Sequence, residues 1–340
     1  MMEKIQQKQP ITQQLKINNT VHAVRAFAPA TSANFAVGFD LIGFAIEGVG
    51  DRVKLTKRTD DQLVISKIYG VKGAEKLPLN VDDNVCSAVI QRFLQDHGLT
   101  IGFDIEIEKG IGLGSGIGGS AASAVGAILA LNEFLQTPLS KTQLIDYAIF
   151  GESLISGGVY HGDNAVPCMF GGLILLQSSK PCSFIKLPTL GLYAALSCPD
   201  IEIETKAARV LLHQPFDIQE VVAQNAKLAA TISALYTNDL SLLKGNLMDV
   251  LVEPMRKVLI PGFDAVKKSA ISAGAIGCGI SGSGPAVFAV TESQILAQKA
   301  KQNMHQAFVD QNCVCQSYVT SLNADGAYVE EVLGENDEVC

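Results

Sequence analysis

The chain has 340 residues, of which 48% are hydrophobic and 18% are charged. This length exceeds the ~100–200 residues of a typical domain, and the apolar content excludes an intrinsically disordered protein and a small disulfide-stapled scaffold. Lys and Arg number 26 and Asp and Glu number 34, which gives a formal net charge of −8. Because this charge would repel a polyanion, we expect no nucleic-acid partner.

The sequence contains no segment typical of a membrane or secretory protein. Its most apolar stretch, residues 121–131, is shorter than the ~18 apolar residues that a membrane helix needs. Residues 1–20 are polar, lack the apolar core of a signal peptide and are expected to form a flexible tail. The eight cysteines form no C-x-x-C pair, which favours reduced, buried thiols over a zinc site. We therefore expect a cytoplasmic protein without a membrane partner.

In the first half of the chain, short strands are predicted at 53–55 and 63–65, and a helix over 85–97. Apolar residues at 103, 105 and 107 then alternate with acidic ones, the pattern of a strand with one solvent-exposed face. A glycine-rich run follows, and residues 120–136 carry apolar side chains at helical spacing. A helix over 141–155 and a buried strand over 171–177 complete this half.

The second half mixes strands and helices in the same way. The predicted strands are 192–197, 286–290 and 314–322, and the predicted helices are 218–236, 240–251, 263–273 and 293–309. This order favours an α+β fold over a doubly wound parallel sheet. The segment 178–188 contains Ser, Lys and two Pro residues, so we place a domain boundary there, between residues 21–178 and 179–340.

Glycine is concentrated in two loops, with six glycines in residues 110–119 and five in 274–284. The first loop joins a predicted strand to the start of a predicted helix, where free backbone N–H groups attract phosphate. Ser120 could cap this helix or direct its hydroxyl at a metal ion held by the phosphates. Both roles fit its position.

Two common nucleotide-binding motifs do not account for these loops. A Walker A motif is excluded because no Lys-Ser or Lys-Thr follows the glycines. The dinucleotide fingerprint is matched nominally by Gly114, Gly116 and Gly119, and again at 277, 279 and 282. The strand before the first match is half-exposed, however, and the second match precedes its strand, so neither has the required context.

Three separated motifs resemble the GHMP small-molecule kinases. They are APATSANFAVGFD at 28–40, GSGIGGSAAS at 114–123 and ISGSGPAVF at 280–288. Two more, HGDN at 161–164 before a Gly-Gly pair and VEPMR at 252–256 before IPG, are similar to those of the homoserine kinases within that family. The resemblance extends from about residue 21 to about 322. Gly112 stands where a Pro commonly opens the loop, and Gly119-Ser120 replaces the usual Ser-Ser pair.

The resemblance implies a two-domain GHMP kinase fold, with an N-terminal ATP-binding domain and a C-terminal ferredoxin-like domain. It also implies an enzyme that phosphorylates the hydroxyl of L-homoserine with ATP and Mg²⁺, for threonine biosynthesis. A homodimer is compatible with it. For the nucleotide it implicates Asn84, Gly112, Leu113, Gly114, Ser115, Gly116, Ile117, Gly118, Gly119, Ser120, Ala121 and Ala122. Asn84 could equally be a helix N-cap.

For the substrate, the resemblance implicates Asp40 on the ammonium, Arg209 and Arg256 on the carboxylate, and Asn34, His161 and Asn164 as further contacts. Guanidinium groups suit a carboxylate because they donate two parallel hydrogen bonds. Ser120 and Glu152 would hold magnesium and, with Asn164, form the catalytic set. Whether Asp163 or His161 acts as a base, or no base is used, stays open.

Three other functions compete with this one. A kinase for another alcohol, such as mevalonate, would not need Asp40, because its substrate has no ammonium. A non-catalytic sensor on the same fold would not need to keep both Ser120 and Glu152. A dehydrogenase is disfavoured by the strand pattern around the first glycine loop.

Overall fold

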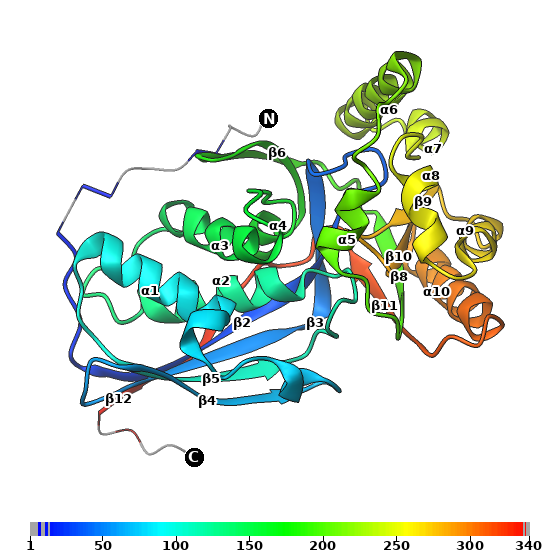
Figure 1. The fold of residues 1–340 in the computed structure, drawn as a ribbon. Helices are drawn as coiled ribbons and strands as arrows, with labels where there is room; N and C mark the ends of the chain where they lie inside the picture. The colour runs from blue at the N-terminus through cyan, green and yellow to red at the C-terminus, as the bar shows by residue number, and fades with distance from the viewer. Residues whose placement is uncertain (1–5, 8–10, 13, 336, 338–340) are drawn as a thin grey trace.

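The computed structural model describes residues 6–7, 11–12, 14–335 and 337, which form an eight-stranded and a four-stranded β-sheet with helices packed against them (Figure 1). The larger sheet is built on two long antiparallel strands, β2 (Val21–Ala33) and β3 (Ile42–Lys57). Beside β2 lies β12 (Tyr328–Gly334). Beyond β3 follow β6 (Leu173–Ser179), β7 (Cys182–Leu187) and β1 (Gln6–Gln7). The second half of β3 also pairs with β5 (Phe103–Lys109), and β4 (Leu63–Gly70) runs parallel to β5.

The two faces of the larger sheet differ in chemistry. One carries cross-strand ion pairs, among them Arg25 with Glu108 at 2.5 Å and Arg52 with Glu330 at 3.0 Å. The other buries apolar residues such as Val53 and Ile105 under the helices. Strand β5 buries every second residue, as its alternating sequence predicts.

Helices α1 (Val85–His97), α2 (Gly119–Asn132), α3 (Lys141–Ile155) and α4 (Ala165–Phe170) cover that face (Figure 1). Helix α2 is central, since it contacts β2, β3, α1 and α3. Every residue from 121 to 132 is buried, which explains why this helix is apolar on all sides. The boundaries predicted for α1 and α3 are confirmed. Helix α2 ends four residues before the predicted 136, and Leu135 forms a β-bridge with Ile17 instead.

The smaller sheet has the antiparallel strand order β11-β8-β10-β9. Its elements in chain order are β8 (Tyr193–Pro199), α9 (Phe263–Ser272), β9 (Gly277–Ile280), β10 (Val287–Thr291), α10 (Gln294–Val309) and β11 (Cys315–Ser321). This βαββαβ arrangement is the expected ferredoxin-like fold. Between β8 and α9 lie α5 (Thr205–Val210), α6 (Ile218–Thr237), α7 (Leu240–Asn246) and α8 (Glu253–Arg256). Short 3₁₀ turns occur at Ala74–Lys76, Val81–Asp83 and Lys257–Leu259.

The sheets do not divide at the boundary that the sequence suggested. Strand β7 pairs with β6, and β12 pairs with β2, so two strands from the segment 179–340 complete the larger sheet. The residues that suggested a linker, Lys180 and Pro181, form the turn of the β6–β7 hairpin. Proline and serine mark tight turns as well as linkers, and composition does not separate the two.

Part of the predicted tail packs against the larger sheet and its helices. Leu15 is buried, and the Asn18 N–H donates to the Phe134 carbonyl at 2.8 Å. Residues 1–5, 8–10 and 13 of that tail lie outside the described residues. All cysteines within the described ranges are free, and each is buried except Cys313, which is half-buried. No helix in those ranges is long and apolar enough to cross a membrane.

Candidate active site

A cavity of about 720 Å³ is lined by residues from both halves of the chain. Ile117, Ala121 and Ala122 are predicted site residues that do not line it, because they are buried in the interior. The other predicted site residues all do: Asn34, Asp40, Asn84, Gly112, Leu113, Gly114, Ser115, Gly116, Gly118, Gly119, Ser120, Glu152, His161, Asn164, Arg209 and Arg256.

The glycine-rich segment leads from β5 into α2. Gly114, Gly116 and Gly118 have φ values of +60°, +80° and +70°, a left-handed conformation that glycine adopts without steric cost. Gly118 is the N-cap of α2, and within the described part of the chain no side chain caps the helix. The N–H groups of the first turn therefore have no capping side chain there and can bind an anion. Because Ser120 is not the N-cap, the capping role that its sequence position allowed is excluded.

Ser120 instead meets Glu152, which α3 carries to the start of α2. The Ser120 hydroxyl donates to Glu152 Oε1 at 2.5 Å. Burial raises the pKa of Glu152 to about 7, and the hydrogen bond from Ser120 partly opposes this rise. Hydroxyl and carboxylate oxygens are hard donors of the kind that magnesium prefers. The described residues hold no cluster of three or more His, Cys, Asp or Glu side chains that could bind a metal alone.

Asn84 lies at the start of α1 and is its N-cap. Its side-chain oxygen accepts from the Cys86 N–H at 3.0 Å, and its amide nitrogen donates to the Pro78 carbonyl at 3.1 Å. The capping role considered from the sequence is therefore present. The side chain also lines the cavity.

Three charged residues meet at the end of the cavity away from α1. Arg209 donates to both carboxylate oxygens of Asp40, at 3.0 and 3.2 Å. Arg256 is buried and donates to the Gly282 carbonyl at 3.1 Å. Its guanidinium carbon lies 4.9 Å from the centre of the Phe39 ring. Burial lowers the pKa of Arg256, and the Asp40 charge opposes that change. The Nε atoms of Arg209 and Arg256 are buried without a hydrogen-bond partner among the described residues.

Asn34 joins this group to the second glycine-rich loop. Its amide nitrogen donates to the Gly282 carbonyl at 2.7 Å, and its oxygen accepts from the Asp40 N–H at 3.2 Å. Ser281 donates to the Gly116 carbonyl at 2.8 Å. The two glycine-rich loops are therefore in direct contact, and the second one supports both the first loop and the charged residues.

The segment 161–164 forms the remaining wall. Asn164 accepts from the Thr31 hydroxyl at 2.8 Å. His161 Nδ1 lies 3.7 Å from Asp163 Oδ1, and that oxygen is buried without a hydrogen-bond partner in the described part of the chain. Burial raises the pKa of the Asp163 carboxyl and lowers the pKa of His161.

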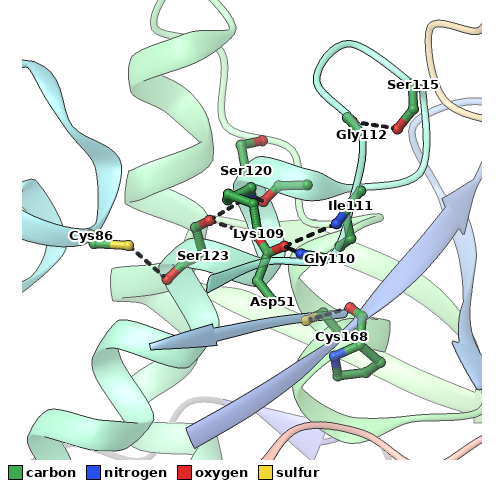
Figure 2. Close-up of polar contacts among 12 residues, drawn as sticks. Asp51, Cys86, Lys109, Gly110, Ile111, Gly112, Ser115, Ser120, Ser123 and Cys168 are labelled. Atoms are coloured by element: carbon green, nitrogen blue, oxygen red, sulfur yellow. Dashed lines mark hydrogen bonds and ion pairs between the residues drawn. The ribbon is translucent and has the colours of Figure 1, made fainter. Parts of the chain in front are cut away.

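A buried ionic network beneath the glycine-rich segment was not predicted from the sequence. Lys109, the last residue of β5, pairs with Asp51 of β3, and both contact Ser123 of α2 (Figure 2). Lys109 lines the cavity, whereas Asp51 is fully buried. The alternating pattern contained a signal for this network, because residue 109 continues the inward-facing series 103, 105 and 107.

Two family models match the chain, "GHMP kinases N terminal domain" over residues 84–172 and "GHMP kinases C terminal" over residues 231–310. The fold is thus that of a GHMP kinase. A homoserine kinase from Xylella fastidiosa (strain M12) is 41% identical over 308 residues, which are 91% of this chain and 94% of that protein. Another, from Chlorobium phaeobacteroides (strain BS1), is 40% identical over 296 residues, or 84% and 92% of the two chains.

Solved structures agree with these matches. The crystal structure of homoserine kinase from Cytophaga hutchinsonii is 39% identical, with a TM-score of 0.86 over 94% of this chain and 100% of that one. The L. major mevalonate kinase, at 16% identity and a TM-score of 0.61, shares the fold. The chain belongs to the homoserine kinase family, which confirms the resemblance seen in the sequence motifs.

Proposed function

We propose that this protein transfers the γ-phosphoryl group of ATP to the side-chain hydroxyl of L-homoserine, giving O-phospho-L-homoserine and ADP in threonine biosynthesis. One observation carries the proposal beyond family membership. Beside the glycine-rich loop, the same cavity is lined by the Asp40 carboxylate and by the guanidinium groups of Arg209 and Arg256. These groups match the ammonium and the carboxylate of a zwitterionic amino acid.

At the nucleotide end, the backbone N–H groups of residues 112–119 would hold the phosphates, and Asn84 would lie against the adenine. Ser120 and Glu152 would hold Mg²⁺ together with phosphate oxygens, because magnesium commonly takes only one or two protein ligands. The ion, when bound, neutralises phosphate charge. The contact between Ser120 and Glu152 supports this pairing, since it brings the two oxygen donors together.

At the substrate end, Asp40 would receive the ammonium, and the two arginines would receive the carboxylate. Asp40 and Arg209 pair with each other at 3.0 Å, so the bound zwitterion would extend an existing ion pair with alternating charges. Asn34 holds the backbone of Asp40. Asn164 and His161 would contact the rest of the amino acid near the glycine-rich loop.

In the reaction, the substrate hydroxyl oxygen attacks the γ-phosphorus, a new P–O bond forms, and the bond to the β,γ-bridging oxygen breaks. The hydroxyl proton leaves to solvent or to an acceptor in the site. Such transition states are loose, so positioning and charge neutralisation supply most of the rate enhancement. The buried, reduced cysteines support a cytoplasmic location for this reaction.

The substrate assignment can be tested by deleting either end of the substrate and its protein partner. Arg256→Ala should lower kcat/KM for homoserine by a factor that corresponds to about 2–5 kcal/mol of lost transition-state stabilisation, because Arg256 is buried. The same variant should scarcely affect 2-amino-1,4-butanediol, which lacks the carboxylate, because the two deletions remove one contact. Asp40→Asn should behave in the same way with 4-hydroxybutanoate, which lacks the amine. An equal penalty on both substrates would show that Arg256 acts on phosphate or on the fold.

A further inference from the structure

Lys109 is a natural candidate for a phosphate-binding cation, because it is buried next to the glycine-rich loop and lines the cavity. Its ammonium, however, already has three protein acceptors: the Asp51 carboxylate, Ser123 Oγ at 2.8 Å and the Gly119 carbonyl at 2.9 Å. An ammonium has three N–H donors. Every donor of Lys109 is therefore used by the protein (Figure 2).

Asp51 is saturated as well. Its Oδ1 accepts from the N–H groups of Gly110 and Ile111, at 3.1 and 3.3 Å, and its Oδ2 accepts from Lys109 and Ser123. The carboxylate thus holds the first two residues of the glycine-rich loop. Lys109 holds the other end of the loop, because Gly119 is the first residue of α2. The pair joins both ends of the loop to β3 and β5.

A phosphate oxygen could reach the Lys109 ammonium only by displacing one of these three partners, of which Asp51 and Ser123 are buried. Removing one partner of a buried ion pair leaves an uncompensated charge, which is strongly destabilising. The pair is also electrically neutral, and it adds little field at the phosphates. These points separate Lys109 from the lysines that bind phosphate as free point charges.

We propose that Lys109 and Asp51 are positioning residues that set the shape of the glycine-rich loop for ATP, and that Lys109 does not contact phosphate. This inference rests on the proposed binding of ATP at that loop. It assigns the phosphate contacts to backbone N–H groups and the bound metal ion.

The two roles of Lys109 make opposite predictions for Asp51→Asn. If Lys109 bound phosphate, this change would free its charge, and nucleotide binding would be unchanged or tighter. If the pair positions the loop, Asp51→Asn and Lys109→Met should each raise the Kd for Mg·ADP and the KM for ATP at least about tenfold. The KM for homoserine should change less than about threefold. The double variant should bind Mg·ADP no more weakly than the single variant with the higher Kd, since both changes disrupt one network.

Calorimetry with Mg·ADP, together with steady-state kinetics, measures these quantities. Ser123→Ala removes one hydrogen bond from each partner without exposing a charge, so it tests the network if the charged variants do not fold, with an expected rise of about two- to fivefold in the Kd for Mg·ADP. Lys141→Met is the matched control. Its ammonium donates to the carbonyls of Met169 and Ala327, away from the cavity, so its loss should lower Tm and leave the Kd unchanged.

Three results would overturn the inference: Asp51→Asn binding Mg·ADP as tightly as the wild type, additive losses in the double variant, or an unchanged Kd in folded Ser123→Ala. A wild-type protein that binds no Mg·ADP would instead refute the proposed function, because the inference concerns only how the loop is held.

Discussion

At the scale of single residues, Glu152 combines a buried carboxyl with a proposed metal site. Its pKa is about 7 in the folded protein, raised by burial from an ordinary value of 4.5. A carboxyl whose pKa is raised by folding binds its proton more tightly in the folded state. Its contribution therefore favours folding at low pH and is lost as the pH rises from about 4.5 through 7.

We expect Glu152→Gln to relieve this loss. In metal-free buffer the variant should gain stability relative to the wild type, with a difference near zero at pH 4.5 that grows to on the order of 1–3 kcal/mol at pH 8. Urea unfolding at the two pH values measures the difference, and the exposed Glu220→Gln serves as a control that should show no such growth. A gain of equal size at both pH values would show that the carboxyl is not forced to ionise within the folded state.

The same substitution should abolish turnover. We expect Glu152→Gln to lower kcat at least about a hundredfold, because it removes the carboxylate proposed to hold the metal ion that neutralises phosphate charge. Homoserine affinity should stay nearly unchanged, since Glu152 contacts Ser120 at the start of α2 and is proposed to act at the nucleotide end. Ser120→Ala should be milder, because a neutral ligand is lost. An ADP-release assay measures both, and near wild-type turnover of Glu152→Gln would refute the magnesium assignment.

The sequence motifs that contain Asn34, Asp40, Arg256 and the glycine-rich loop are far apart in the chain, and the structure brings them to one cavity. Residues whose partner is supplied by the fold were not predicted. Asp51 and Lys109 were missed because an isolated charge in a strand is usually exposed. Asp51 and Lys109 become partners only through the β3–β5 register, which pairs Arg52 with Glu108 and so brings Asp51 beside Lys109.

At the scale of elements, the second glycine-rich loop is explained by its contact with the first. A Cβ on Gly116 would lie 2.6 Å from the Gly284 carbonyl oxygen and 2.9 Å from that of Ser281. Neither distance is tolerated without movement of the backbone. Because the Gly282 carbonyl accepts from Asn34 and Arg256, a shift of the second loop reaches the substrate end of the cavity.

Gly116→Ala should therefore raise KM for ATP and for homoserine together, each by at least about fivefold, in addition to a backbone cost of roughly 1–2 kcal/mol for the left-handed conformation. Gly48→Ala is the matched control, since Gly48 has φ +76° and, apart from its chain neighbours, no described residue has an atom within 4 Å of a Cβ added there. It should lose similar stability and keep both KM values. Kinetics and thermal unfolding of the two variants separate the effect of the lost loop–loop contact from the effect of backbone strain. A rise in KM for ATP alone, with KM for homoserine unchanged, would refute the coupling of the loops.

The sequence predicted elements best where periodicity was uninterrupted, as in α1, α3, α10 and β5. It did not predict β2 as a strand, because Pro29 and several alanines interrupt a β pattern, and the pairing with β3 shifts register at that proline. The helix predicted over 240–251 ends at Asn246. The apolar spacing continues beyond that residue, but the N–H groups of residues 251–253 bond to the Asp249 side chain and not to helix carbonyls.

At the scale of the whole molecule, the two sheets are joined by more than one crossing of the chain. After the last strand of the smaller sheet, the chain comes back to the larger sheet, where β12 pairs with β2. Lys141 of α3 donates to the carbonyl of Ala327, the residue before β12. This return is a long-range pairing, and long-range pairings are not encoded in local patterns. The motif resemblance predicted the two-domain architecture. Which strands belong to which sheet became clear only from the strand pairing in the structure.

Phosphorylation of homoserine is the activity on which the proposed roles of these residues depend. A coupled ADP-release assay over homoserine, threonine, serine and mevalonate, with and without Mg²⁺ and with the phosphorylated product identified by mass, tests it most directly. We expect Mg²⁺-dependent ADP release to be fastest with homoserine, with one O-phosphohomoserine formed per ADP. Equal or faster phosphorylation of mevalonate, or ADP release from homoserine mixtures without O-phosphohomoserine, would contradict the proposed function.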